Sequence, residues 1–151
     1  MTFAGCGCPP QMILDFFGPD LASTIIVKPV VPAEQMHELF GAHDIFLFPS
    51  LMEGQPTVVL EALASGMPVI TTETCGMPDY IVDHINGLLI PPADSSAIEQ
   101  AVLCLAQSLD LRQQLGRVAQ QSMSGYTWER SAQALERLFR QAIDRKGPTP
   151  E

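Results

Sequence analysis

Two acidic residues, Glu53 and Glu61, stand eight positions apart around the start of a predicted helix. The apolar run 44–48 ends at a Pro-Ser pair, so the residues that follow are expected to form a loop. Pro56 suits the first position of a helix, and apolar residues then recur at helical spacing until Gly66 ends it. One carboxylate is therefore predicted in the loop, and the other about one turn into the helix.

The chemistry of such a pair follows from the helix opening between the two carboxylates. The first backbone N–H groups of a helix lack intrahelical acceptors and favour an anion such as phosphate. A ligand rich in hydroxyl groups would in addition donate hydrogen bonds to both carboxylates. The segment from Glu53 to Glu61 therefore predicts a site for a phosphate that carries a sugar. By itself, Glu61 also fits the plainer role of a first-turn acid favoured by the helix dipole.

Strands and helices are predicted to alternate along the chain, which is typical of an α/β domain with a parallel sheet buried on both faces. In such sheets ligands bind beyond the carboxyl ends of the strands. Gly5, Ser50, Glu53 and the segment 72–76 all follow predicted strand ends, so they are expected on one rim. Strands are predicted at 2–4, 24–27, 44–48, 68–72 and 88–90, and helices at 11–17, 32–40, 57–65, 95–106, 110–122 and 127–144. We predict one Rossmann-like domain over residues 1–144 and a flexible tail over 145–151.

Composition narrows the possible partners and location. The chain has 151 residues and a net charge of −9, from 17 acidic and 8 basic residues. This balance argues against nucleic acid or an anionic membrane as a direct partner. No apolar run reaches the roughly 18 residues of a transmembrane segment, and the N-terminus lacks the basic start of a signal peptide. The four cysteines are few and unevenly spaced, as expected of reduced thiols in a cytoplasmic protein.

The segment 49–70 resembles the E-x7-E signature of retaining GT-B glycosyltransferases, specifically the large family 4 group, also described as glycosyl transferases group 1. The segments 67–72, 76–82, 86–92 and 126–128 resemble later parts of the same family, in the same order. The resemblance extends from about residue 1 to 139. It implies the C-terminal, nucleotide-sugar-binding half of a GT-B fold, with the first strand of that half missing.

The resemblance also implies roles for individual residues. Glu61 would accept hydrogen bonds from the ribose hydroxyls of the nucleotide, and Glu53, as the catalytic residue, would face the hydroxyls of the transferred sugar. The residues that would pass beneath the diphosphate are Gly54, Gln55, Pro56 and Thr57, with the N–H groups of Gln55 and Thr57 among the donors. The family commonly has an aromatic residue where this chain has Gln55, which leaves the identity of the sugar open.

Two further segments could have either a functional or a purely structural role. Val30 lies where the family contacts the nucleobase, and core packing is an equal alternative for it. The pair Cys6 and Cys8 could be half of a zinc site, but no second pair stands at ligand spacing, so a structural role is favoured. No metal ligand and no cofactor are expected.

The parts of the family that this sequence does not match also lead to expectations. The first strand and loop of the family carry an arginine and a lysine that neutralise the diphosphate; no position here matches them, and Lys28 follows a different strand. That strand lies in the middle of the sheet. We therefore expect the chain to close the gap by direct pairing, to exchange elements in a dimer, or to bind a partner chain. In similar proteins the last helix crosses to the N-terminal acceptor domain, so part of its apolar face is expected to meet a partner surface.

The function implied is transfer of a sugar, with retention, from a nucleoside-diphosphate sugar to a hydroxyl acceptor, either a saccharide or a lipid-linked saccharide. Polysaccharide or glycolipid biosynthesis is the expected setting, with any peripheral membrane contact made through the missing domain. The isolated chain is expected to be inactive. The alternatives are a GT-B-like sugar-nucleotide epimerase or phosphorylase, or a non-catalytic nucleotide-sugar-binding half that assembles with a partner chain.

Overall fold

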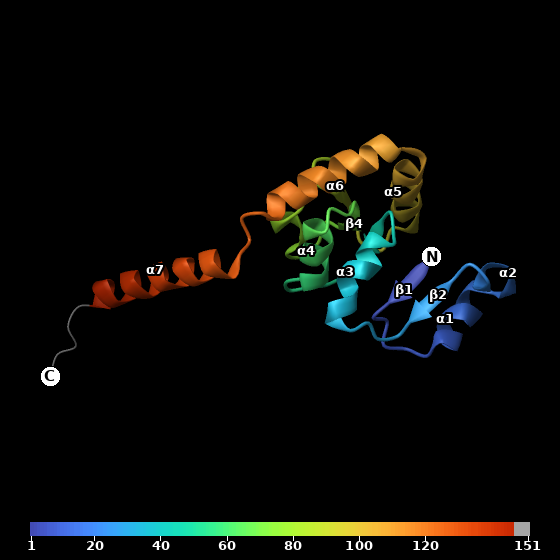
Figure 1. Ribbon diagram of the computed structural model, residues 1–151, viewed down its shortest axis with the longest axis horizontal. Helices are drawn as coiled ribbons and strands as arrows, with labels where there is room; N and C mark the ends of the chain where they lie inside the picture. Colours follow the sequence, from blue (N-terminus) through green and yellow to red (C-terminus); the bar gives the residue numbers. More distant parts are fainter. Residues whose placement is uncertain (147–151) are drawn as a thin grey trace. The chain divides into compact units, whose positions relative to one another are not determined.

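The computed structural model describes residues 1–146, and the chain divides into two units, Met1–Ala42 and His43–Glu151 (Figure 1). Strands and helices alternate, and every strand pair is parallel, which confirms the predicted α/β class. The five strands form two sheets, one with the order β1-β2 and one with the order β3-β4-β5. They do not form the single sheet that direct pairing across the gap would give. Element exchange in a dimer and a partner chain remain predictions.

The first unit is small and has little core of its own. Its elements are β1 (Thr2–Ala4), α1 (Pro10–Phe17), α2 (Pro19–Ala22), β2 (Ile26–Lys28) and α3 (Ala33–Gly41). Gly5 and Gly7 follow β1 with φ of +67° and +63°, and their N–H groups donate to the carbonyls of Lys28 and Pro29. Strand β2 begins two residues later than predicted, because the N–H and hydroxyl of Thr24 both close a turn onto one carbonyl oxygen.

The second unit contains the main core. Its elements are β3 (Phe46–Phe48), α4 (Thr57–Ala64), β4 (Val69–Thr72), the short 3-10 helix η1 (Met77–Asp79), β5 (Leu88–Ile90), α5 (Ser95–Gln107), α6 (Leu109–Met123) and α7 (Trp128–Lys146). All four residues of the central strand β4 are buried. Ile70 in β4 lies opposite Leu88 in β5, and both pack with Leu105 and Leu115 from the helices that cover the sheet. Burial of these side chains supplies the main favourable term in folding.

Helix α4 is held against α6 by a contact between two glycines. A β-carbon at Gly116 in α6 would collide with the carbonyl oxygen of Gly66, which follows α4 with φ of +77°. The side chain of Gln120 in α6 donates a hydrogen bond of 3.3 Å to the carbonyl of Ala64, the last residue of α4. Because α6 thus fixes the C-terminal end of α4, the direction in which the start of α4 points is fixed too.

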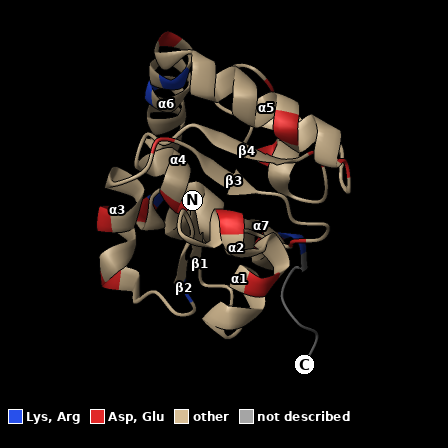
Figure 2. Cartoon of the chain, turned by 90° about the vertical axis from the view of Figure 1, so that its right-hand side faces the viewer, with Lys and Arg blue, Asp and Glu red and all other residues tan. Residues whose placement is uncertain are grey.

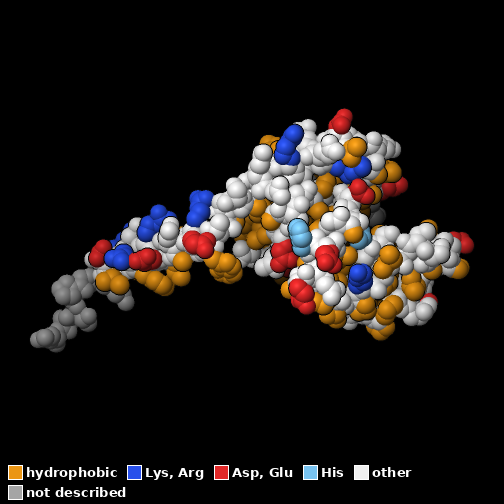
Figure 3. Space-filling model, in the orientation of Figure 1, with side chains coloured by type: hydrophobic (Ala, Val, Ile, Leu, Met, Phe, Trp, Pro, Cys, Tyr) orange, Lys and Arg blue, Asp and Glu red, His pale blue; other side chains and the backbone are white. Residues whose placement is uncertain are grey.

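Helix α7 differs from the rest of its unit. From Trp128 to Arg145 every residue is exposed. Figure 3 shows hydrophobic side chains along one side of the helix and Lys and Arg side chains along the other. Five of the eight basic residues of the chain lie in α7, whereas acidic residues are spread over the helices of both units (Figure 2).

Helix α7 runs two residues beyond the predicted end at 144, so Arg145 and Lys146 belong to the helix rather than to the tail. The remainder of that tail, 147–151, lies outside the described residues. Over residues 1–146, no helix is both long enough and apolar enough to cross a membrane.

Candidate functional site

Two loops at the carboxyl edge of the second sheet form the candidate site. The 50–57 loop joins β3 to α4, and the 73–80 loop follows β4. Because β3 and β4 are parallel neighbours, both loops leave the sheet at the same edge. The hydroxyl of Thr72 donates a hydrogen bond of 2.6 Å to the carbonyl of Ser50, and the hydroxyl of Thr71 donates one of 2.8 Å to the carbonyl of Phe48. The buried end of β4 therefore fixes the start of the 50–57 loop.

The two loops also contact each other further along. A β-carbon placed on Gly76 would come within 2.6 Å of the carbonyl oxygen of Gly54, so the backbones touch at this point. One residue later, the side-chain amide of Gln55 donates a hydrogen bond of 3.0 Å to the hydroxyl of Tyr80. The 73–80 loop thus supports the part of the 50–57 loop that was predicted to bind a ligand.

Glu53 lies in the 50–57 loop, as predicted. Its side chain is half-buried, and one carboxylate oxygen accepts a hydrogen bond of 3.2 Å from the hydroxyl of Ser50. The same hydroxyl lies 3.3 Å from the carbonyl of Met52. The carboxylate retains further acceptor capacity, because an ionised carboxylate can accept about four hydrogen bonds.

Glu61 lies one turn into α4, also as predicted. Its side chain is exposed and shares a face with Thr57, four residues earlier, whereas Val59, Ala62 and Leu63 are buried on the opposite face. The ion pairs found over residues 1–146 join His84 to Asp83 and Arg140 to Glu136. Neither Glu53 nor Glu61 is therefore neutralised by a cation within that range.

The helix opening between the two glutamates presents backbone N–H groups without acceptors. Pro56, which was predicted to be the first helical residue, is instead the N-cap of α4, and no side chain caps the helix. Within the described part of the chain, the N–H groups of Gly54, Gln55, Thr57 and Val58 have no acceptor. The first intrahelical bonds come from Val59 and Leu60, which donate to the carbonyl of Pro56. Backbone N–H groups left in this state attract an anion.

The two loops of this rim contain no basic residue. From residue 43 to 127 the chain contains two basic residues, Arg112 and Arg117, and both lie in α6. Arg112 donates hydrogen bonds of 2.6 and 3.2 Å to the carbonyls of Leu105 and Ala106 at the end of α5. Within these two loops, backbone N–H groups rather than basic side chains are therefore available to an anion at the start of α4.

Val30, the remaining predicted site residue, belongs to the first unit. It follows β2 and is 79% exposed, so the alternative of core packing is wrong.

The two neighbouring cysteines of the first unit affect each other. Desolvation is the main cause that raises the pKa of the Cys8 thiol above its usual value, and the neighbouring Cys6 thiol is the second. In residues 1–146 no three His, Cys, Asp or Glu side chains lie close enough together to hold a metal ion.

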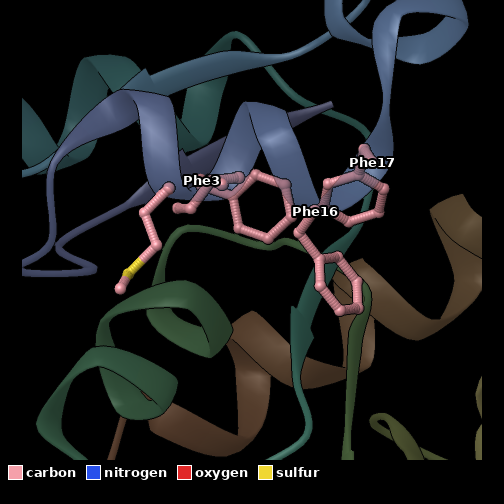
Figure 4. A pocket seen from close by; sticks show the side chains of 5 residues that line it. Phe3, Phe16 and Phe17 are labelled. Atoms are coloured by element: carbon pink, nitrogen blue, oxygen red, sulfur yellow. The ribbon is translucent and has the colours of Figure 1, made fainter.

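An apolar hollow of about 300 Å³ in the first unit is a less suitable ligand site (Figure 4). It is lined by Phe3, Met12, Ile13, Phe16 and Phe17, which offer no charged or hydroxyl groups. A phosphate or a sugar placed there would lose its hydrogen bonds to water without replacing them. The hollow therefore does not compete with the loop rim as a nucleotide-sugar site.

Sequence reasoning missed the side chains that support the rim. Tyr80 and Gln55 are 25 residues apart, and no local spacing rule connects them. The segment 76–82 was singled out for its resemblance to the family, but nothing in it marked Gly76 as a backbone contact. A threonine pair at the end of a buried strand, Thr71 and Thr72, was the available signal, since buried hydroxyls need hydrogen-bond partners.

Comparison with known proteins identifies the family. The family model described as glycosyl transferases group 1 matches residues 20–122, which include both loops and α4. The chain belongs to this family. The matched range contains the E-x7-E segment, the 73–80 loop, helices α4 and α5, and all of α6 except its last residue.

Individual relatives of the group 1 family agree with this assignment. The D-inositol 3-phosphate glycosyltransferase of Corynebacterium kroppenstedtii is 33% identical over 135 residues, which cover 85% of this chain and 30% of the relative. The chain therefore spans less than a third of that relative's length. Among solved structures, sucrose-phosphate synthase from Thermosynechococcus elongatus has a TM-score of 0.83 at 22% identity and covers 93% of this chain and 38% of its own. HepE from Anabaena, solved in complex with UDP, has a TM-score of 0.73 at 21% identity, over 85% of this chain and 35% of its own. These likenesses establish the GT-B glycosyltransferase fold.

Proposed function

We propose that this chain is the nucleotide-sugar-binding part of a retaining glycosyltransferase. The complete enzyme would transfer a sugar from a nucleoside diphosphate to a hydroxyl acceptor, a saccharide or a lipid-linked saccharide. The observation that carries the proposal is the start of α4, where four backbone N–H groups without acceptors lie between two carboxylates without ion-pair partners in the described chain. This combination suits a diphosphate flanked by hydroxyl-rich groups.

Each residue of the rim has a role in this proposal. The exposed carboxylate of Glu61 accepts hydrogen bonds from the ribose hydroxyls, and the half-buried carboxylate of Glu53 faces the hydroxyls of the transferred sugar. The backbone of Gly54, Gln55, Pro56 and Thr57 passes beneath the diphosphate, where the free N–H groups stabilise the negative charge that grows as the diphosphate departs. Because Gly54 has no side chain, the phosphates can approach the backbone closely at this position. Val30 would contact the nucleobase.

The isolated chain is proposed to bind without transferring sugar. The two loops of the rim contain no Lys or Arg, and neutralising the leaving diphosphate needs positive charge as well as N–H dipoles. The resemblance implies no metal requirement, so a chelator such as EDTA is expected to leave binding unchanged. The remaining charge and the acceptor pocket would come from the part of the relatives' length that this chain does not span.

Calorimetry with a panel of nucleoside diphosphates and nucleotide sugars tests the proposal directly. The wild-type chain is expected to bind the ribonucleoside diphosphate of one base more tightly than its deoxyribose analogue. Glu61→Gln is expected to abolish that preference, because the neutral amide is a weaker acceptor for the ribose hydroxyls. Glu53→Gln is expected to weaken binding of the nucleotide sugar and leave binding of the bare diphosphate unchanged.

The matched control for both substitutions is Glu99→Gln, an exposed glutamate in α5, remote in sequence from both loops. It makes the same change of charge and should leave every affinity unchanged. Absence of binding to all nucleotides, or equal effects of the three substitutions, would contradict the site assignment. Sugar-nucleotide epimerisation or phosphorolysis by the complete protein, without an acceptor, would instead favour the alternative activities of this architecture.

A further inference from the structure

We propose that Tyr80 is a positioning residue of this site, which holds the 50–57 loop in its ligand-binding form through a hydrogen bond to Gln55. The proposed consequence for ligands rests on the proposed function above. The hydrogen bond between Tyr80 and Gln55 cannot be inferred from the E-x7-E spacing, because Tyr80 lies outside that segment. The inference depends on the geometry of the two loops alone.

The hydrogen bond itself is well placed for this role. The Gln55 side-chain nitrogen lies 3.0 Å from the Tyr80 hydroxyl oxygen, within the normal range. Gln55 is otherwise exposed, and an exposed glutamine gains conformational entropy when it is released. Its side chain therefore stays ordered only if its partner is itself fixed in position.

Tyr80 is fixed from two directions. Its ring packs edge-to-face with the ring of Tyr126, with centroids 5.7 Å apart. Its carbonyl accepts a hydrogen bond of 2.9 Å from the side-chain amide of Asn86, which is buried. Asn86 in turn accepts from the N–H of Val82 at 2.7 Å and lies 3.2 Å from the hydroxyl of Ser122 in α6. The backbone of Tyr80 is thus anchored, through Asn86, to the helix that also holds α4, and the contact with Tyr126 fixes the ring that carries the hydroxyl.

Through this hydrogen bond, Tyr80 restricts the motion of the Gln55 backbone. Its N–H has no acceptor within residues 1–146 and lies between Glu53 and the opening of α4. A backbone N–H group binds an anion well only if it already points in the right direction, because reorientation on binding costs free energy. By holding the Gln55 side chain, Tyr80 limits the rotation of that peptide unit before any ligand arrives.

The test compares Tyr80→Phe with Tyr126→Phe in the 151-residue chain. Each substitution removes one hydroxyl from the same aromatic pair and keeps both rings, but only the hydroxyl of Tyr80 accepts a hydrogen bond from Gln55. Tyr80→Phe is expected to lower the NMR order parameters of the backbone N–H bonds of Gly54 and Gln55, because release of the Gln55 side chain frees this part of the loop. Affinity for the nucleoside diphosphate that the wild-type chain binds should fall by about two- to tenfold, the range for loss of one hydrogen bond. Tyr126→Phe should change neither.

A second substitution distinguishes positioning from a general structural effect. Gln55→Leu removes the other end of the same hydrogen bond, so the double variant with Tyr80→Phe should be no worse than either single variant. Equal order parameters in Tyr80→Phe and Tyr126→Phe would overturn the inference, as would lower order parameters with unchanged affinity. If the wild-type chain binds no nucleotide, the proposed function fails, and the order parameters of Gly54 and Gln55 still decide whether Tyr80 holds the loop.

Discussion

At the scale of single residues, Gly76 shows how closely the two loops of the site pack. Its missing side chain lets the backbone of the 73–80 loop touch the carbonyl of Gly54. The hydroxyls of Thr71 and Thr72 and the side chain of Gln55 complete the same contact region. Glu53 and Glu61 could be predicted from their spacing in the sequence. The residues that hold the 50–57 loop in place could not, because their contacts join it to β4 and the 73–80 loop across the sheet edge.

Gly76→Ala should destabilise the second unit and loosen the 50–57 loop. The new β-carbon would lie 2.6 Å from a backbone oxygen, and relief requires the loops to separate. We expect a loss of about 1–3 kcal/mol in the free energy of unfolding, the usual cost of overpacking. Urea unfolding followed by circular dichroism measures it. Gly54→Ala is the control, because a β-carbon there meets nothing within 4 Å, and its effect on unfolding should be small.

At the scale of elements, the sequence predicted helices better than strand ends. The spacing of apolar residues located α5, α6 and α7 to within two residues, because helical periodicity accumulates over many turns. Strand β2 was misplaced by two residues, since a β-branched run also suits the turn that Thr24 closes. The short α2 and η1 were not predicted at all, because three- and four-residue helices carry no periodic signal.

The apolar face of α7 is expected to be covered by another domain or chain, as the family resemblance implies. In this chain that face contributes nothing to the core, since Leu135, Phe139 and Ile143 are at least half exposed. The double substitution Leu135→Ser and Phe139→Ser should therefore change the free energy of unfolding by less than about 0.5 kcal/mol. It should also reduce self-association, as measured by light scattering.

A buried leucine provides the contrast for α7. Leu115 in α6 is 0% exposed, so Leu115→Ala should cost about 2–5 kcal/mol in the same urea experiment. If the α7 double variant were as unstable as Leu115→Ala, the exposed face of α7 would have to be part of the core, and the expectation of an external partner would be wrong.

At the scale of the whole molecule, the core is unequally divided between the two units. Sixteen apolar residues are buried within the described range, and Phe40 is the one that precedes His43. The α/β class and the family could be predicted from the sequence, whereas the division into two sheets could be anticipated only as one of several outcomes. Strand pairing depends on which strand edges meet in space, and that information is not local in the sequence.

Amide hydrogen exchange should report this unequal division. Exchange in β3, β4 and β5 is expected to be slower than in β1 and β2, because opening of the second unit exposes far more buried apolar surface. Mass spectrometry of peptides from the exchanged chain gives the comparison, with α7 as an exposed reference. Equal protection of the two sheets would mean that the first unit gains stability from contacts other than its own small core.

The groups that we propose to bind an anion at the start of α4 are backbone N–H groups, and this affects how such a protein can evolve. Mutation can replace the side chains at Gln55, Thr57 or Val58 and leave their N–H groups in place, with proline as the exception. Descendants of one ancestral gene could thereby change their sugar specificity while keeping the backbone groups proposed to bind the pyrophosphate. In these residues, side-chain atoms can vary while the main-chain atoms keep their role.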